Sequence, residues 1–326
     1  MPHDGIVFVL VGPSGAGKNT LMRRVQAQFD GLRQLATMTT RSMRPGEQQG
    51  REHWFVSHSE FEALIGQDAL FEWQRVHMND LYGTPRKTVN DAIATGHDLI
   101  ADIEFLGAGK IQESYGDHAV FIFVTPSRLE ILADRITQRG NITPEEVANR
   151  LERAKFEMTF APRSDYLVIN DEIEVATEQL ARIVASERYR RRGQGSRDAV
   201  IPRDVFHTSV LPLIHDDGHL LARGHIGQYS IPCYDSEDAF QAPHDLLHER
   251  LLADLGQEVR IESHADDRFD FVAPNHVTIG FAGTDKELGF YYRCAPTAPL
   301  VPPAGWVWCA LDTLSLPAPL GDLIAM

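Results

Sequence analysis

The stretch that most constrains the fold is a glycine-rich loop directly after an apolar run. Residues 6–25 read IVFVLVGPSGAGKNTLMRRV. A buried strand, a tight glycine turn and a helix in this order form an anion site, because the turn points backbone N–H groups inward and the helix N-terminus adds partial positive charge. The stretch fits the template G-x-x-x-x-G-K-[ST] except at its last position, Asn19. The sequence therefore predicts a phosphate cradle.

The predicted cradle consists of nine consecutive residues, Gly12, Pro13, Ser14, Gly15, Ala16, Gly17, Lys18, Asn19 and Thr20. Lys18 is expected to reach the β and γ phosphates of a bound nucleotide. Asn19 replaces the hydroxyl that usually binds Mg²⁺, but an amide oxygen is also a hard ligand. Asp102 ends an apolar strand, where a carboxylate can face metal and phosphates. Asn19 and Asp102 are therefore the predicted metal ligands.

Bulk composition excludes several classes of protein. The chain has 326 residues, which favours two domains, and a formal net charge of −15, which argues against a general nucleic-acid binder. No apolar run approaches the ~18 residues of a membrane span, and the first apolar run reads as a buried strand rather than a signal peptide. Three scattered cysteines fit a reducing cytoplasm better than a disulfide framework.

The first half of the chain alternates between apolar runs and helical patterns. Strands are predicted at Ile6–Val11, Leu99–Ile103, Ala119–Val124 and Tyr166–Ile169. Helices are predicted at Lys18–Phe29, Arg128–Arg139, Pro144–Met158 and Glu172–Arg188. Strands that are apolar on both faces and separated by helices indicate an α/β fold with a parallel sheet covered on both sides. The polar and aromatic block from Thr37 to Gly96 is typical of an inserted module with its own short strands.

The character of the chain changes near residue 190. Residues 187–204, ERYRRRGQGSRDAVIPRD, read as a solvated helix end that runs into a linker. We predict a first domain over 1–192, a linker over 193–204 and an α+β domain over 205–326. The last domain is expected to contain a hairpin around residues 216–218, a helix near 245–256 ended by Gly256, and a final strand in WVWCALD.

Several segments after the loop point to one family. They include TMTTRSMRPGEQQGREHWFVS, LFEWQRVHMNDLYGTPRKTV and DLIADIEFLGA, followed by RITQRG, ANRLERAKFEM and SDYLVINDE. In order and spacing they resemble the guanylate kinase family over roughly residues 5–190. The resemblance implies a P-loop nucleoside monophosphate kinase fold with an inserted acceptor-binding module and a lid. It implies ATP- and Mg²⁺-dependent transfer to GMP or dGMP, and small nucleotides as partners, with a homodimer possible.

Residue chemistry suits that resemblance. Arg41 and Arg44 stand three apart in a turn, as bidentate phosphate ligands can, and a Glu72 carboxylate could accept from guanine N1–H and N2–H, although surface roles remain alternatives. The resemblance makes Thr37, Glu72 and Thr84 guanine readers, and Tyr82, Arg41 and Arg44 phosphate ligands. It places Asp102 and Glu104 beside acceptor and metal, and Arg135, Arg139 and Arg150 in the lid. The predicted catalytic residues are Lys18, Arg41, Arg135, Arg139 and Arg150.

The chain departs from the family pattern around acceptor and metal. Besides Asn19, His53 stands where the family has a phosphate-binding tyrosine, and Leu81, Glu104 and Leu106 replace the usual residues. These departures support a ribose 1,5-bisphosphate phosphokinase as an alternative. A non-catalytic guanylate-kinase-like binding module is a second alternative, which Lys18 and the lid arginines disfavour.

The C-terminal domain resembles a Nudix domain in layout more than in chemistry. The Nudix helix carries glutamates that hold Mg²⁺ for pyrophosphate cleavage. Counted back from Gly256, the corresponding positions read Asp235, Gln241, Glu249, Arg250 and Ala253, and only Asp254 is acidic in the metal-binding pair. We predict a degenerate module for ligand binding, dimerisation or regulation rather than a hydrolase. His244 and His248 stand four apart, a spacing more often structural than metal-binding.

Overall fold

The structure is a computed structural model of the whole chain. It describes all residues except 1–4, 52, 76–79, 104–110, 112–113, 139–141, 193–200, 217–218, 226–227, 231, 237–240, 263–264, 267–270, 273, 283–284, 305 and 311–326. Contacts divide the chain into a first unit, Met1–Ser127 with Ser164–Arg203, and a second unit, Arg128–Arg163 with Asp204–Met326. Within the described part, no helix has both the length and the apolar character needed to cross a membrane.

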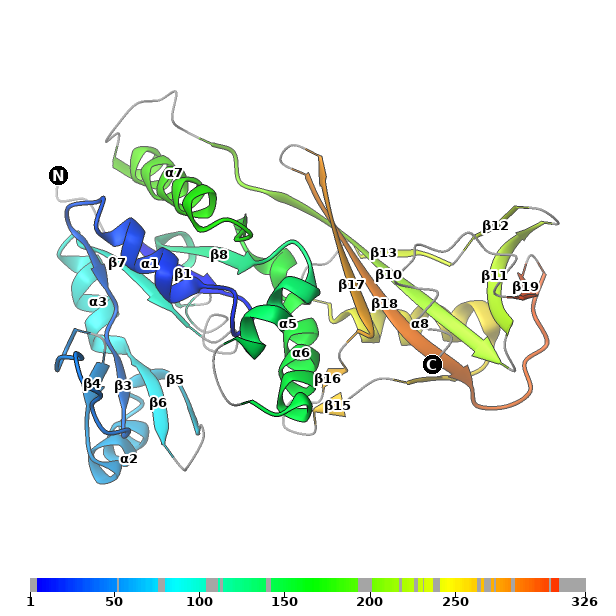
Figure 1. Cartoon of the computed structure of the whole chain (residues 1–326), viewed down its shortest axis with the longest axis horizontal. Coiled ribbons are helices and arrows are strands. Elements are labelled where there is room, and N and C mark those ends of the chain that lie inside the picture. The colour runs from blue at the N-terminus through cyan, green and yellow to red at the C-terminus, as the bar shows by residue number, and fades with distance from the viewer. Residues whose placement is uncertain are drawn as a thin grey trace. The chain divides into compact units, whose positions relative to one another are not determined.

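A five-stranded parallel sheet forms the centre of the first unit (Figure 1). Its order is β2 (Leu32–Gln34), β7 (Asp98–Asp102), β1 (Val7–Val11), β8 (Ala119–Thr125) and β9 (Tyr166–Ile169). The predicted parallel sheet is confirmed, with one short strand, β2, added at its edge. Every residue of β1 and β8 is buried, as expected of strands that helices cover on both faces.

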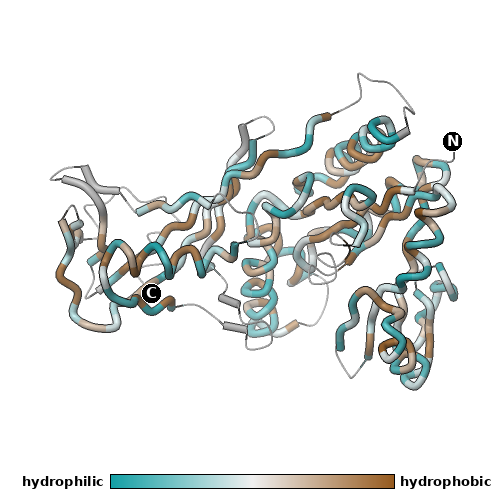
Figure 2. Tube along the Cα trace, turned by 180° about the vertical axis from the view of Figure 1, so that it is seen from behind, coloured by the Kyte–Doolittle hydropathy of each residue, from teal (hydrophilic) through white to brown (hydrophobic). Residues whose placement is uncertain are grey.

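Two helices pack against this sheet through apolar side chains. Helix α1 spans Lys18–Gln26 and helix α7 spans Ile173–Arg192. Leu21 and Val25 of α1 and Leu180 and Ile183 of α7 join the strand residues in one buried cluster. The apolar strands and the inner faces of these helices stand out in Figure 2. The packing holds the N-terminus of α1 at the end of β1, where the glycine loop lies.

The block from Thr37 to Gly96 forms a module with a second sheet. Its strands are β4 (His53–Phe55), β3 (Thr37–Thr39), β6 (Leu81–Pro85) and β5 (Leu70–Arg75), in that order. It also contains helices α2 (His58–Gly66) and α3 (Arg86–Ala94), which the sequence analysis did not predict. Helix α2 begins at a capping box between Ser57 and Glu60, which satisfies two terminal N–H groups. Phe61 of α2 packs with Leu70 and Leu81 of the sheet.

The second unit contains a pair of helices and a large sheet. Helices α5 (Leu129–Thr137) and α6 (Pro144–Met158) pack through Leu132, Ile136 and Ala154. Short 3₁₀ turns lie at Gly116–His118 in the first unit and at Ala161–Arg163 in the second.

The sheet of the second unit has eight strands. They are β10 (Val205–Asp216), β11 (His219–His225), β12 (Gln228–Ser230), β13 (Tyr234–Ser236), β14 (Val259–Ile261), β17 (His276–Ala282), β18 (Asp285–Pro296) and β19 (Trp306–Ala310). A separate ribbon joins β15 (Ala265–Asp266) and β16 (Phe271–Val272). The predicted hairpin is confirmed as the antiparallel pair β10–β11. The predicted helix is α8 (Pro243–Leu255), and Gly256 caps it at φ 68°.

The basic end of α7 differs from the solvated terminus that its composition predicts. Arg188 Nε lies 2.7 Å from Asp98 Oδ2, and Asp98 also accepts the backbone N–H of Ile6 through Oδ1. Asp98 is buried, so its charge needs these partners. The arginine run therefore binds acids that the fold brings to it.

Residues 201–203, which the sequence analysis placed in a linker, are attached to the first unit. Arg203 donates to Asp165 at 2.7 Å and to Glu187 at 3.2 Å. Glu187 is only 1% exposed and also accepts from Tyr166 Oη at 2.6 Å. Burial would raise the pKa of Glu187, but hydrogen bonds from Arg203 and Tyr166 outweigh it and hold that pKa below its usual range. Ile201 exchanges backbone hydrogen bonds with the Ser186 hydroxyl.

Removing the Arg203 charge should destabilise the first unit. We expect Arg203→Met to lower the free energy of unfolding by about 1–3 kcal/mol, because Glu187 stays buried with fewer partners. Urea unfolding followed by circular dichroism would measure the change. As a matched control, Arg182→Met on the exposed side of α7 should change it by less than about 0.5 kcal/mol. Equal effects of the two variants would contradict the assigned role of Arg203.

Candidate active site

The glycine loop adopts a backbone that its neighbours require. Gly12 and Gly17 have φ angles of 128° and 91°, which residues with a side chain rarely adopt. A Cβ atom at Gly12 would lie 2.2 Å from the carbonyl oxygen of Val124. A Cβ atom at Gly17 would lie 2.3 Å from Asn170 Nδ2. The loop therefore needs glycine at both positions for backbone conformation and for space.

Asn170, which directly follows the C-terminal end of β9, holds the glycine loop in place. Its Nδ2 donates to the carbonyl oxygen of Ala16 at 2.6 Å, and its backbone N–H donates to Thr125. Asn170 is buried, so this contact is well shielded from water. The sequence analysis gave Asn170 no role, although it lies within the segment SDYLVINDE that carried the family resemblance. Only the register of β8 and β9 places it beside the loop.

Lys18 and Asn19 at the start of α1 lie close to Asp102 at the end of β7. The Lys18 side chain is only 12% exposed. Its ammonium donates to the carbonyl oxygens of Gly12 and Pro13 and lies 3.6 Å from Asp102 Oδ1. Asp102 pairs with Leu10 of the neighbouring strand β1, and this register brings it to the cradle. Asn19 Nδ2 donates to Asp102 Oδ2 at 3.2 Å. The amide nitrogen of Asn19, not the oxygen expected to bind metal, thus faces Asp102.

The inserted module gathers most of the predicted acceptor residues on one face of its sheet. Thr37 lies opposite His53, and Tyr82 lies opposite Thr39. Since side chains alternate along a strand, Thr84 shares the face of Tyr82. Thr84 Oγ1 donates to Glu72 Oε1 at 2.7 Å. Thr37 Oγ1 and His53 Nδ1 lie 2.7 Å apart.

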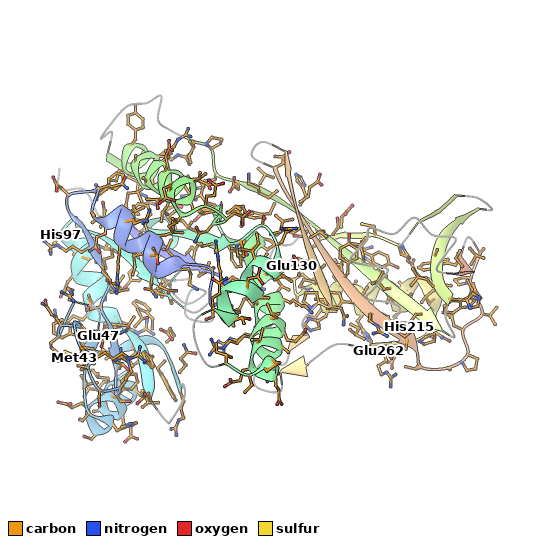
Figure 3. The ribbon with its side chains drawn as sticks, in the orientation of Figure 1. Met43, Glu47, His97, Glu130, His215 and Glu262 are labelled. Carbon is orange, nitrogen blue, oxygen red and sulfur yellow. The ribbon has the colours of Figure 1, made fainter. Side chains whose placement is uncertain are left out.

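Arg41 is held on this side of the module by three kinds of contact. Its guanidinium makes a bidentate pair with Glu47, at 2.9 and 2.8 Å, and its Nε donates to Tyr82 Oη at 2.9 Å. The guanidinium carbon also lies 5.5 Å from the ring centre of Phe55. Glu47, labelled in Figure 3, had no assigned role in the sequence analysis. Its place in TTRSMRPGE, three residues after Arg44, was the available signal.

Arg44 differs from Arg41 in its surroundings. Its side chain is exposed, while its backbone N–H donates to Glu47 Oε2 at 2.7 Å. Glu47 therefore joins the backbone at Arg44 to the side chain of Arg41. The phosphate-binding role of Arg41 and Arg44 stays a prediction.

Charge pairing shifts two pKa values at this turn. The hydrogen bonds from Arg41 lower the pKa of Glu47 from its ordinary 4.5 to about 2. The hydrogen bond to Glu47 in turn raises the pKa of Arg41. Arg41 is therefore a permanent cation whose planar fork is already oriented for a bidentate anion.

The remaining predicted residues fall elsewhere. Arg135 lies on α5 and Arg150 on α6, both in the second unit. Arg139 and Glu104 lie outside the described residues. Thr20 is exposed on the first turn of α1. The roles of these five residues stay predictions.

The fold and the cradle together define a P-loop phosphotransferase of the nucleoside monophosphate kinase class. The parallel sheet, the positive-φ glycines and Lys18 form the phosphate loop, and the inserted module carries a second group of polar residues. The sequence profile described as "Guanylate kinase" matches residues 5–187. The chain belongs to the guanylate kinase family, and is therefore a nucleoside monophosphate kinase that uses ATP as phosphate donor and acts on small nucleotides.

Two curated relatives agree with this assignment by sequence. A guanylate kinase of Bordetella pertussis is 40% identical over 212 residues, which cover 65% of this chain and 96% of the relative. A guanylate kinase of Desulfitobacterium hafniense is 40% identical over 188 residues, covering 58% and 93%. The crystal structure of guanylate kinase from Anaplasma phagocytophilum is 28% identical, covers 58% of this chain and 88% of its own, and has a TM-score of 0.45.

The ion pair between Arg41 and Glu47 should make the free energy of unfolding depend measurably on pH in the acidic range. Because the folded-state pKa of Glu47 is lowered to about 2, the stabilisation is complete above pH 4.5 and is lost as the pH falls from there toward 2. We expect the difference in unfolding midpoint between the wild-type chain and Glu47→Gln to stay constant from pH 7 to 5 and to shrink below that. Thermal unfolding across this range would test it, and a constant difference down to pH 2.5 would contradict it.

Proposed function

We propose that this chain is an ATP-dependent GMP kinase that forms GDP, with dGMP as a second acceptor. The observation that carries the proposal is the shared face of the inserted sheet. There a Glu72–Thr84 pair, suited to a purine edge, accompanies an Arg41–Tyr82 pair, suited to a phosphate. One nucleoside monophosphate offers both chemistries at its two ends.

Glu72 supports guanine over adenine through its hydrogen-bonding capacity. An ionised carboxylate only accepts, and guanine presents two adjacent donors at N1 and N2. Adenine presents an acceptor at N1, which would oppose the carboxylate. The Thr84 hydroxyl is buried and donates to one Glu72 oxygen, which fixes the orientation of the carboxylate. We assign Thr37 to the same base, beside Glu72 and Thr84.

The mechanism that we propose relies on positioning and charge neutralisation. Phosphoryl transfer needs no protein nucleophile, so catalysis consists of aligning donor and acceptor and screening the moving group. Lys18 and the loop amides would hold the donor phosphates, and Arg41, Arg44, Tyr82 and His53 the acceptor phosphate. Arg135, Arg139 and Arg150 are proposed to approach the transferred group from the lid, excluding water.

The donor set at the end of β7 fits a divalent cation. Asp102 is a hard oxygen donor, 27% exposed, within reach of the Lys18 ammonium and hence of the phosphates that Lys18 would bind. When bound, Mg²⁺ would neutralise charge on the donor phosphates. We assign Asp102, with Glu104 nearby in the sequence, to this side of the site.

A substitution of Glu72 tests the base that the site selects. We expect Glu72→Gln to lower kcat/KM for GMP by about 10²–10³-fold, because the new amide places a donor against the donors of guanine. Release of ADP with GMP, dGMP, AMP and ribose 1,5-bisphosphate as acceptors would measure it. Glu62→Gln on the exposed face of α2 is the matched control and should leave the rate unchanged. A wild-type preference for ribose 1,5-bisphosphate would overturn the substrate and favour the alternative phosphokinase.

A second substitution tests the donor side alone. Lys18→Ala should abolish turnover, since no other side chain of the loop can bring an ammonium to the phosphates. The unfolding midpoint should change little, because the contacts of Lys18 are made by its ammonium group with the loop and Asp102, and not by apolar atoms in the core. Isothermal titration with a nonhydrolysable ATP analogue should show a loss of binding affinity for the analogue. Full activity of this variant would discredit the assigned cradle.

For the C-terminal region we propose a degenerate Nudix-like module over 205–326 that does not hydrolyse pyrophosphates. Asp254, its one acid in the expected metal-binding pair, accepts from Tyr234 Oη at 2.7 Å. We propose a kinase domain over 1–192 and a joining segment over 193–204, of which residues 201–203 contact the first unit and Asp204 the second. A regulatory, ligand-binding or dimer-forming role remains the proposal for this module.

A further inference from the structure

Asn19 is the residue at which this chain departs most sharply from the phosphate-loop template. It occupies the second position of α1, directly after Lys18. Its side chain reaches across to the end of β7, where Nδ2 lies 3.2 Å from Asp102 Oδ2. The other oxygen of the same carboxylate, Oδ1, lies 3.6 Å from the Lys18 ammonium. Asp102 is thus held between two consecutive residues of α1.

Chemistry fixes which end of the Asn19 amide faces Asp102. A carboxylate at neutral pH has no proton to donate, so only the NH₂ end of the amide can make a favourable contact with it. The opposite orientation would place two oxygens against each other. An amide nitrogen has no lone pair to offer a cation, because that pair is delocalised into the carbonyl.

From this geometry we infer that Asn19 is a positioning residue that orients the Asp102 carboxylate, and not a ligand of the metal ion. The inference rests on the proposed function of this site in nucleotide phosphoryl transfer. A serine or threonine hydroxyl at this position can donate its proton to an acid and still offer lone pairs to a cation. A carboxamide whose nitrogen is committed to Asp102 turns its oxygen away from that carboxylate.

The consequence for catalysis concerns Lys18. In the proposed reaction Lys18 turns to the donor phosphates and leaves its position beside Asp102. The hydrogen bond from Asn19 then keeps the Asp102 carboxylate in place. Asp102 becomes the protein ligand on which cation binding depends, and Asn19 acts only through it.

The first test measures how strongly Mg²⁺ and nucleotide binding are coupled, with no acceptor present. The full chain is titrated calorimetrically with a nonhydrolysable ATP analogue, with and without Mg²⁺. The measured ratio is the dissociation constant without Mg²⁺ divided by the dissociation constant with Mg²⁺. Asn19→Ala should leave this ratio within about 2-fold of wild type, whereas Asp102→Asn should lower it at least 10-fold. A loss in Asn19→Ala equal to that in Asp102→Asn would make Asn19 a metal ligand and overturn the inference.

The second test is a double-mutant cycle on turnover. Asn19→Ala should lower kcat about 5- to 10-fold in the wild-type background and less than 2-fold in the Asp102→Asn background, since its role passes through that carboxylate. Asn19→Ser should regain most of the wild-type kcat because a hydroxyl can also donate to Asp102. Independent effects of the two substitutions, or no recovery with serine, would overturn the positioning role.

These tests separate the inference from the proposed function. The calorimetric measurement contains no acceptor, so its outcome stands whether the acceptor is GMP or another phosphate. Failure of GMP as acceptor would show only in the activity panel. Since Asn19 is exposed, the variants should keep the wild-type unfolding midpoint, which is measured alongside.

Discussion

The close approach of the glycine loop to the ends of β8 and β9 is the constraint on which the rest of this structure depends. The glycine loop passes so near the ends of β8 and β9 that a methyl group at Gly12 or Gly17 would overlap Val124 or Asn170. This approach is possible only because β1 lies in register between β7 and β8. The register of β1 with β7 delivers Asp102 to the loop, and the register of β8 with β9 delivers Asn170. Strand order, and not the loop alone, therefore builds the cradle.

Each of two cations of the site forms an ion pair with a carboxylate of the same chain. Lys18 lies beside Asp102, and Arg41 makes a bidentate pair with Glu47. A carboxylate uses the same fork of N–H donors that a phosphate would use, so Glu47 holds Arg41 in a phosphate-binding orientation. In the proposed function, the acceptor phosphate competes with Glu47 for those donors. This competition lowers the affinity for phosphate, but the Arg41 side chain is already ordered before the phosphate binds. Asp102 and Glu47 thus each hold one cation of this site in place.

How much the sequence could predict follows the kind of signal each element carries. The apolar runs predicted the strands of the first sheet, and β9 and α6 have the predicted bounds. Strand β2 was missed because its three residues, only one of them buried, give no apolar run. Helix α2 was missed although its capping box is visible in the sequence, because short helices among aromatic strands blur the periodicity. Motifs in the sequence gave the candidate site residues, whereas the contact of Asn170 with Ala16, 154 residues away, could be seen only in the structure.

The junction after residue 200 shows why composition alone cannot assign a linker. Arg203 and Asp204 are consecutive, yet Arg203 pairs with Glu187 and Asp165 in the first unit, and Asp204 pairs with Lys286 at 3.3 Å in the second. Lys286 and Asp204 are 10% and 11% exposed, so breaking either end leaves a poorly solvated charge. A run of arginines remains in solvent only if the fold brings no carboxylate close to it. Here the acids that bind the arginines are Asp98 on β7, Asp165 just before β9 and Glu187 on α7. Only the folded structure shows that the chain is fixed to the first unit up to Arg203 and to the second unit from Asp204 onward.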